Sequence, residues 1–276
     1  MPQAWPSLMT EQFPQSRAGL HAFAKLLGVY ASALAPRRRH WWHISLKPAA
    51  GGFRTGVLES KEQLFELALS FDPLEIELMM AGERRQSWPL QGESAQSIRQ
   101  QLDIALARHA IAVELDESRI TTARHAIDPG CASRLGQVYG QLAQGFARFR
   151  SVLAVETSPI QLWPHHFDLA MLVLPGRKIP GQDPANEELS DEQLNFGFVP
   201  GDEGIAEPYF FITHYAQAGR LAEVPLPDIA RLHTEGWTGI VLTYEAFRHA
   251  PDPEASLLGL WQAAWAVTVS SQSEKL

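Results

Sequence analysis

Cysteine is almost absent from this sequence, because Cys131 is the only one among 276 residues. A single cysteine excludes an intrachain disulfide and every zinc or iron–sulfur site that is built from several cysteines. Basic residues are also few: 23 Lys and Arg stand against 31 Asp and Glu, which gives a formal net charge of −8. Because nucleic-acid phosphates require a basic protein face, we expect no nucleic-acid partner.

The sequence also lacks an apolar run long enough to span a membrane. Its first residues, MPQAWPSLMTEQ, lack the basic and apolar regions of a signal peptide. We therefore expect a cytoplasmic protein without a membrane partner. A glycine-rich phosphate loop, a GxSxG elbow and a Cys–His nucleophile pattern are missing too, which removes the commonest nucleotide-binding and acyl-transfer functions.

Four segments have the apolar spacing of three and four residues that is typical of amphipathic helices. They lie at residues 16–35, at 94–111 with Ser94 as the expected N-cap, from about 128 to 153, and after the Asp252-Pro253-Glu254 start.

Eight further runs favour β-strands through their alternation and their β-branched or aromatic content. They are residues 40–46, 65–72, 74–80, 85–90, 166–174, 195–200, 208–215 and 239–247. Because strands outnumber connecting helices, we predict an α+β fold with mainly antiparallel curved sheets and helices packed on one face. The order helix, four strands, helix occurs twice. We interpret it as a pseudo-twofold duplication of units 1–127 and 128–276, packed as a single globular domain.

The segment at residues 180–194, PGQDPANEELSDEQL, is acidic and has no periodicity. We expect it to be a solvated surface loop, with a lid over a site as the alternative.

Histidines begin two of the predicted strands, in the runs HWWHISL and WPHHFDLAML. Alternate side chains of a strand face opposite ways, so His166 and Asp168 share one polar face and His43 lies on the corresponding face of the other run. Such a set can act as a general base with its orienting acid, or ligate a divalent metal (Zn, Fe or Mn), or simply satisfy its own hydrogen bonds. His166, Asp168 and His43 are therefore the candidate catalytic and metal-binding residues. His165 falls on the apolar face, where we expect a buried, hydrogen-bonded role.

Five more residues are candidates for substrate binding. Arg39, which ends the run Arg37–Arg39, and Arg177 could hold an anionic group, because arginine binds carboxylate and phosphate through two parallel hydrogen bonds. Trp41, Asn195 and Tyr209 could line a pocket. The alternatives are a solvated loop for the arginines and core or turn positions for the other three.

Several motifs, read in order, resemble those of a bacterial family known only as domain of unknown function 5996. They are PRRRHWWHISL, FARFR, SPIQLWPHHFDLA, PGR and FGFVPGD. The resemblance extends from about Leu20 to the last helix. This chain differs at Arg39, where the family has Asn, at Gln161, where it often has His, and at residues 164–166, where Trp-Gly-Ser is usual. The resemblance implies no known activity.

Two functions follow from these patterns. The first is an enzyme that acts on a small anionic molecule at a His/Asp site on a sheet face. The second is a non-catalytic module that binds a small molecule or a protein partner through a concave, aromatic-lined sheet. Either would be a monomer or a homodimer.

Overall fold

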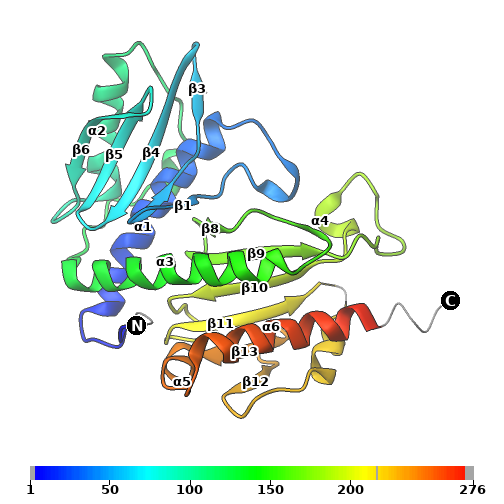
Figure 1. Ribbon diagram of the computed structural model, residues 1–276. Helices are drawn as coiled ribbons and strands as arrows, with labels where there is room; N and C mark the ends of the chain where they lie inside the picture. The colour runs from blue at the N-terminus through cyan, green and yellow to red at the C-terminus, as the bar shows by residue number, and fades with distance from the viewer. Residues whose placement is uncertain (1–3, 216, 271–276) are drawn as a thin grey trace. The chain divides into compact units, whose positions relative to one another are not determined.

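The computed structural model describes residues 4–215 and 217–270. Its contacts divide the chain into two compact units. Unit 1 comprises the residues up to Leu142 together with Gln161–Phe167, and unit 2 comprises Ala143–Ile160 together with the residues from Asp168 onward. Each unit combines helices with antiparallel strands, which confirms the α+β class and the antiparallel pairing (Figure 1). The internal duplication and the 127/128 boundary stay predictions.

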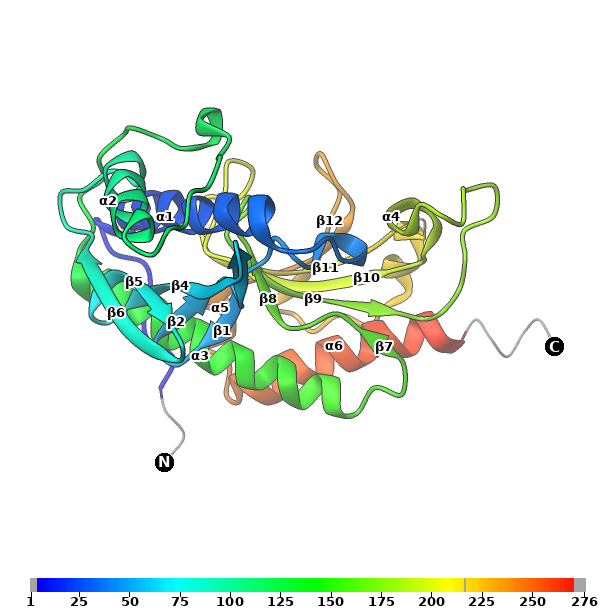
Figure 2. The same cartoon turned by 90° about the horizontal axis from the view of Figure 1, so that it is seen from above.

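Unit 1 is built on a sheet with the strand order β1-β2-β4-β5-β6, in which β3 also pairs with β4. Figure 2 shows α1 and α2 on the same side of this sheet. The helices are α1 (Phe13–Leu34), α2 (Ala95–Ala107) and the first part of α3 (Pro129–Ser151), with the single turns η1 (Arg39–Trp41) and η2 (Glu117–Arg119). The strands are β1 (Lys47–Ala49), β2 (Gly52–Arg54), β3 (Leu58–Ser60), β4 (Gln63–Phe71), β5 (Leu74–Met80), β6 (Glu83–Pro89) and β8 (Gln161–Trp163).

Unit 2 is built on the strand order β12-β13-β11-β10-β9-β7, and Figure 1 shows α6 lying along this sheet. The strands are β7 (Glu156–Thr157), β9 (Asp168–Leu174), β10 (Leu194–Val199), β11 (Tyr209–His214), β12 (Ala230–His233) and β13 (Gly239–Thr243). The remaining elements are the end of α3, the helices α4 (Glu187–Ser190), α5 (Tyr244–Arg248) and α6 (Pro253–Ser270), and η3 (Ala218–Glu223). Of the helices in the described ranges, none has the length and apolar content that crossing a membrane requires.

Alternation along the strands explains both cores. In β4 the side chains of Phe65, Leu67, Leu69 and Phe71 are all buried, because every second residue of a strand faces the same way. In unit 2 the indole of Trp261 on α6 stacks on Phe146 of α3, with 4.5 Å between the ring centroids. This aromatic contact holds α6 to α3 through buried apolar area.

Most of the predicted elements are confirmed. The four helical segments correspond to α1, α2, α3 and α6, and the oxygen of Ser94 caps α2 by accepting a hydrogen bond from the Ser97 N–H (3.1 Å). Seven of the eight predicted strands correspond to β4, β5, β6, β9, β10, β11 and β13.

The strand predicted at residues 40–46 is wrong. His40 and Trp41 have φ angles of 48° and 57°, which turn the chain through η1, and pairing begins only near Lys47. Two consecutive left-handed residues cannot continue a β-ladder. The start of the strand predicted at 166–174 is wrong as well, because Pro164–Phe167 forms a turn and β9 begins at Asp168.

Replacing Gly52 with alanine should destabilise unit 1. A Cβ at Gly52 would lie 2.0 Å from the carbonyl oxygen of Leu69 on the paired strand β4. The backbone of a paired strand cannot move aside as a flexible side chain can. We therefore expect the free energy of unfolding to fall by about 1–3 kcal/mol or more, as measured by urea denaturation.

Gly140 in α3 provides the matched control, because a Cβ there would meet nothing within 4 Å. Gly140→Ala should be neutral or stabilising by up to about 1 kcal/mol. Equal effects of the two substitutions would contradict the assignment of Gly52 to a close strand contact.

Candidate functional site

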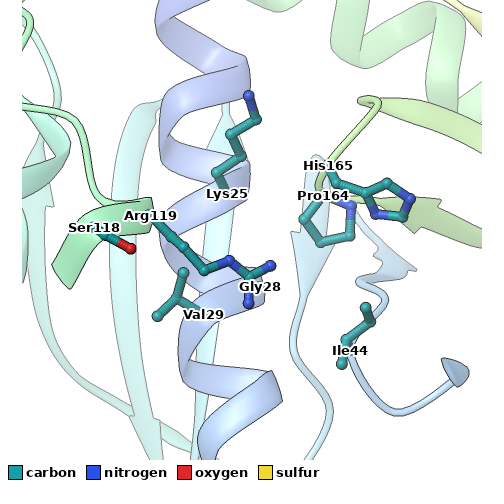
Figure 3. A pocket seen from close by; sticks show the side chains of 8 residues that line it. All are labelled: Lys25, Gly28, Val29, Ile44, Ser118, Arg119, Pro164 and His165. Carbon is teal, nitrogen blue, oxygen red and sulfur yellow. The ribbon is translucent and has the colours of Figure 1, made fainter. Parts of the chain in front are cut away.

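A cavity of about 370 Å³ lies within unit 1 and is lined by three basic side chains and no acidic one. Lys25, Arg119 and His165 supply the basic groups, and the other lining residues are Gly28, Val29, Ile44, Ser118 and Pro164. Figure 3 shows the Arg119 side chain reaching from η2 across α1 toward the turn that carries Pro164. The volume is in the range of small-molecule sites.

A chain of polar contacts holds η2, and with it Arg119, against α1 and α2. The Tyr30 hydroxyl of α1 donates a hydrogen bond to Asp103 of α2 (2.7 Å), and Arg99 is paired with the same carboxylate (2.7 Å). Arg99 also donates to Glu117 of η2 (2.7 Å). Because Arg99 neutralises Glu117, this acidic neighbour does not occupy Arg119.

The two cations of the cavity have no side-chain partner within residues 4–215 and 217–270. The side chains of Lys25 and Arg119 are exposed and make no hydrogen bond or ion pair with any residue that the structure describes. Lys25 interrupts an otherwise buried stretch of α1, between Ala24 and Leu26. Lys25 lies on α1 and Arg119 on η2. Because neither is paired with another described residue, both can bind the same anion.

The opposite wall is the turn Pro164–Phe167, whose backbone is fixed from two sides. The imidazole of His21 donates from Nε2 to the carbonyls of Pro164 (3.0 Å) and His165 (3.2 Å), and the Tyr139 hydroxyl donates to the carbonyl of Phe167 (2.8 Å). Phe167 is held at a φ of 63°, a conformation that costs energy outside glycine.

Gly28 allows α1 to approach this turn closely, because a Cβ there would lie 2.6 Å from the Cβ of Pro164. The close approach brings His165, the residue after Pro164, to the edge of the cavity. The adjacent histidines of the WPHHF run are therefore explained by a rigid turn that presents one imidazole to the cavity.

His165 is neutral near pH 7. Partial desolvation of the imidazole at the cavity edge is the largest cause of a lowered pKa, and the charges of His166, Arg119 and Lys25 lower it further, to about 4. A neutral imidazole can both donate and accept a hydrogen bond, whereas Lys25 and Arg119 only donate. The cavity therefore combines two fixed positive charges with one group that can exchange a proton.

Four of the residues predicted from sequence lie in unit 1. His166 is exposed and its ring lies 4.3 Å from that of His165. His43 is nearly buried, and its Nδ1 accepts a hydrogen bond from the Arg38 N–H (3.3 Å). Trp41 is 42% exposed and stacks beside His43, and the Arg39 guanidinium lies 5.8 Å from the Trp42 ring.

The other four lie in unit 2. The strand registers place Asp168, Asn195 and Tyr209 on one face of the sheet. The Tyr209 hydroxyl donates a hydrogen bond to Asp202 (2.6 Å). Asp168 Oδ1 and Asn195 Oδ1 are buried without a hydrogen-bond partner in the part of the chain that the structure describes. Burial raises the pKa of the Asp168 carboxyl to about 7.

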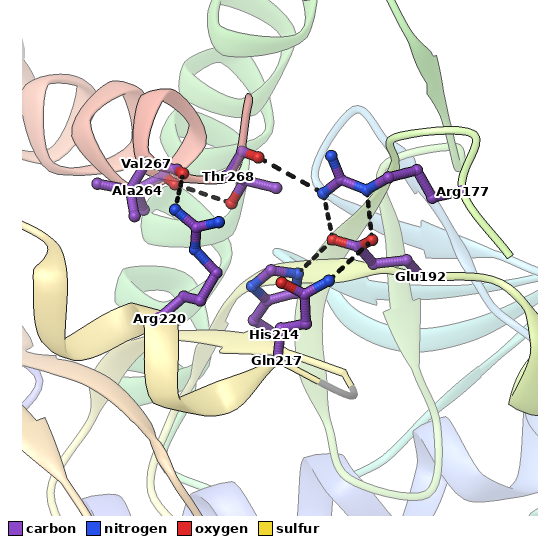
Figure 4. A network of polar contacts seen from close by, with 8 residues as sticks. All are labelled: Arg177, Glu192, His214, Gln217, Arg220, Ala264, Val267 and Thr268. Carbon is purple, nitrogen blue, oxygen red and sulfur yellow. Dashed lines mark hydrogen bonds and ion pairs between the residues drawn. The ribbon is translucent and has the colours of Figure 1, made fainter. Parts of the chain in front are cut away.

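Arg177, which was predicted to hold an anionic group of a substrate, is already paired with a carboxylate of the protein itself. Its guanidinium grips the Glu192 carboxylate through Nε (2.5 Å) and Nη2, and Nη2 also reaches the Thr268 carbonyl at the end of α6 (3.4 Å). Figure 4 shows this network, which His214 joins by donating to Glu192 (2.7 Å). Glu192 is 3% exposed, so the expectation that residues 180–194 form a solvated loop is wrong at this end of the segment.

A metal site at His43, His166 and Asp168 was one of the alternatives that the sequence predicted. Within the described ranges, no group of three or more His, Cys, Asp or Glu side chains could hold a metal ion. The catalytic roles of His43, His166 and Asp168 stay predictions.

Comparison with protein families places the chain as the motifs suggested. The model of the family of unknown function DUF5996 matches residues 5–273. The chain belongs to the DUF5996 family. Comparison with curated proteins and with solved structures found no match.

Three residues of the cavity in this DUF5996 protein were not predicted from sequence. His165 was expected to be buried and hydrogen-bonded, but it is exposed at the cavity edge because its strand is in fact a turn. Lys25 could have been found from the sequence, because a single cation within a long apolar stretch of a helix indicates a specialised position. Arg119 could not have been found from the sequence, because the placement of η2 depends on the tertiary contact between Arg99 and Glu117.

Proposed function

We propose that this DUF5996 protein binds a small anionic molecule, through its carboxylate or phosphate group, in the cavity of unit 1. One observation carries the proposal: Lys25 and Arg119 both line the cavity, and neither has a partner among the described residues. Charge-assisted hydrogen bonds from arginine and lysine are the strongest that a carboxylate or phosphate receives. The absence of any acidic lining residue favours an anion over a cation or a neutral ligand.

The neutral His165 supports a ligand that carries hydrogen-bonding groups beside its charge. Its imidazole can accept from a hydroxyl or donate to a carbonyl of the same molecule. A bound anion would also offset the charges of Arg119 and Lys25, which are among the causes of the low pKa of His165. Ligand binding should therefore raise the pKa of His165 above about 4.

The first test is isothermal titration calorimetry of the full chain against a panel of small phosphates, dicarboxylates and hydroxy acids. At least one anion should bind, and its affinity should fall with increasing salt because the contact is ionic. Arg119→Gln and Lys25→Gln should each weaken binding by about tenfold to a hundredfold, the value of a hydrogen bond to a charged group.

The matched controls are Arg85→Gln and Lys61→Gln, which remove exposed cations of unit 1 that do not line the cavity. Both should leave the affinity unchanged. NMR titration of the histidine rings supplies an independent readout through the pKa of His165. The proposal fails if no anion binds, or if the cavity variants bind as tightly as the controls.

A further inference from the structure

Lys47 at the start of β1 is held by neutral groups alone. Its Nζ donates to the Trp42 carbonyl (2.8 Å) and lies 2.5 Å from the Ser45 hydroxyl and 3.4 Å from Oε1 of Gln161. All of these residues belong to unit 1. Neutral acceptors stabilise an ammonium much less than a carboxylate does.

The charged groups around Lys47 are positive. After burial, the charge of Arg38 lowers the pKa of Lys47. Burial, then the charges of Arg37 and Lys47, lower the pKa of His43, and Arg54 lies opposite Lys47 in the β1–β2 register. Glu66, the acid that is paired with Arg54 (3.5 Å), does not contribute to the pKa of Lys47. A lysine that is both desolvated and next to another cation is activated as a nucleophile.

Gln161 adds an unused donor to the same cluster. Its side chain is fully buried, and Oε1 is fixed as the acceptor because Ser45 donates to it (2.6 Å) and Lys47 lies beside it. The amide nitrogen Nε2 then has no hydrogen-bond partner among the described residues. A buried donor without an acceptor indicates a place for an oxygen atom of a ligand or of water.

We propose that Lys47 is a nucleophilic lysine that forms an imine with a small carbonyl compound bearing an anionic group, a 2-oxo acid in the simplest case. Lys47 is half-buried, and the charge of the neighbouring Arg38 guanidinium favours an acid over an uncharged ketone. This activity goes beyond anion binding in the cavity and does not depend on it.

The reaction balances without an oxidant or a reductant. The lone pair of the neutral Lys47 amine forms a C–N bond to the carbonyl carbon as the C–O π bond breaks, and the proton that the attacking nitrogen loses passes to the carbonyl oxygen to give a carbinolamine. Loss of water then gives the imine, so amine plus carbonyl yields imine plus water. The Ser45 hydroxyl, 2.5 Å from Nζ, is placed to relay the proton.

Burial, and then the charge of Arg38, lower the pKa of Lys47 to about 8. Roughly one tenth of the amine is therefore neutral at pH 7, far more than for a lysine with its usual pKa. Imine formation should rise with pH and level off above about 8.

The test is reductive trapping on the full chain. Protein is incubated with pyruvate and sodium borohydride, and peptide mapping by mass spectrometry locates the reduced adduct. Lys47 should be modified at least tenfold faster than the exposed Lys61 of the same chain, and acetone, which lacks the carboxylate, should react more slowly at Lys47 than pyruvate does.

The comparison of Lys47 with Lys61 uses only the wild-type chain, so its result does not depend on whether a variant folds. Lys47→Arg should abolish the fast adduct, and Arg119→Gln should leave it unchanged, which separates this inference from the proposed function. Modification of Lys47 no faster than of Lys61 would overturn the inference, as would equal rates with pyruvate and acetone.

Discussion

Arg177→Leu should lower the free energy of unfolding by roughly 3–5 kcal/mol at pH 7, the cost of leaving a buried charge without its partner. The Glu192 carboxylate is 3% exposed and receives hydrogen bonds from Arg177, His214 and Gln217. Arg177 is the one permanent cation among these donors. Without it, the carboxylate would have to be protonated, charged without compensation, or brought to water.

The double variant Arg177→Leu/Glu192→Leu distinguishes this cause from a simple loss of packing. Removing both charges avoids the unpaired carboxylate, so the double variant should be more stable than Arg177→Leu alone. Arg248→Leu breaks the solvent-accessible pair between Arg248 and Glu245 and serves as the control, with an expected loss below about 1 kcal/mol. A double variant less stable than the single one would contradict the interpretation.

The effect of Arg177→Leu should also depend on pH. Burial alone would raise the pKa of Glu192, but the hydrogen bonds and charges of Arg177 and His214 outweigh it and lower the pKa from 4.5 to about 2. A depressed folded-state pKa stabilises the fold above the unfolded-state value, and that stability is lost as the pH falls through about 2. The difference between wild type and variant should therefore narrow as the pH falls below about 4.5.

Asp168→Asn, in contrast to the destabilising Arg177→Leu, should stabilise the folded protein at neutral and alkaline pH. Burial raises the pKa of this carboxyl from 3.8 to about 7, so the folded state binds the proton more tightly than the unfolded state. The stability that this proton contributes is fully present below 3.8 and is lost as the pH rises through about 7. Three pH units correspond to roughly 4 kcal/mol at most, since each unit is worth 1.36 kcal/mol.

The measurement is urea denaturation of wild type and Asp168→Asn at pH 4 and pH 8. We expect nearly equal stability at pH 4 and a gain of about 2–4 kcal/mol for the variant at pH 8. Asp228→Asn, at an exposed position, is the isosteric control and should change stability little at either pH. Destabilisation by Asp168→Asn at pH 8 would mean that the ionised carboxylate is stabilising.

A buried carboxyl that destabilises the fold is often retained because it serves a function. Asp168 was predicted as a catalytic residue, and that role stays a prediction. Asp168 Oδ1, which has no hydrogen-bond partner in the described part of the chain, and the raised pKa of the carboxyl are the properties that a proton-exchanging carboxyl requires.

Local patterns in the sequence were sufficient for most of the secondary structure. The apolar spacing of α1, α2, α3 and α6 and the alternation in β4, β10 and β11 depend on side chains within one element, so a single chain segment reveals them. Family membership was also predicted correctly from motifs such as HWWHISL and FGFVPGD.

The two histidine runs show where local patterns fail. HWWH and WPHHF alternate as strands do, yet His40, Trp41 and Phe167 have positive φ angles. The hydrogen bonds from His21 and Tyr139 to the turn at 164–167 compensate for such a conformation, and these donors are distant in sequence. A period-2 pattern carries no information about partners that far away.

The sequence by itself determined the α+β class, the antiparallel pairing, most helix and strand positions and the family, because each is encoded by neighbouring residues. Only the tertiary structure decided which charges are free and which are occupied. Arg177 resembles a ligand-binding arginine in the sequence but is held by Glu192. Arg119, which no motif marks, has no side-chain partner among the described residues, because Arg99 neutralises the neighbouring Glu117. Pairing is a property of distances between segments, and those distances exist only in the folded chain.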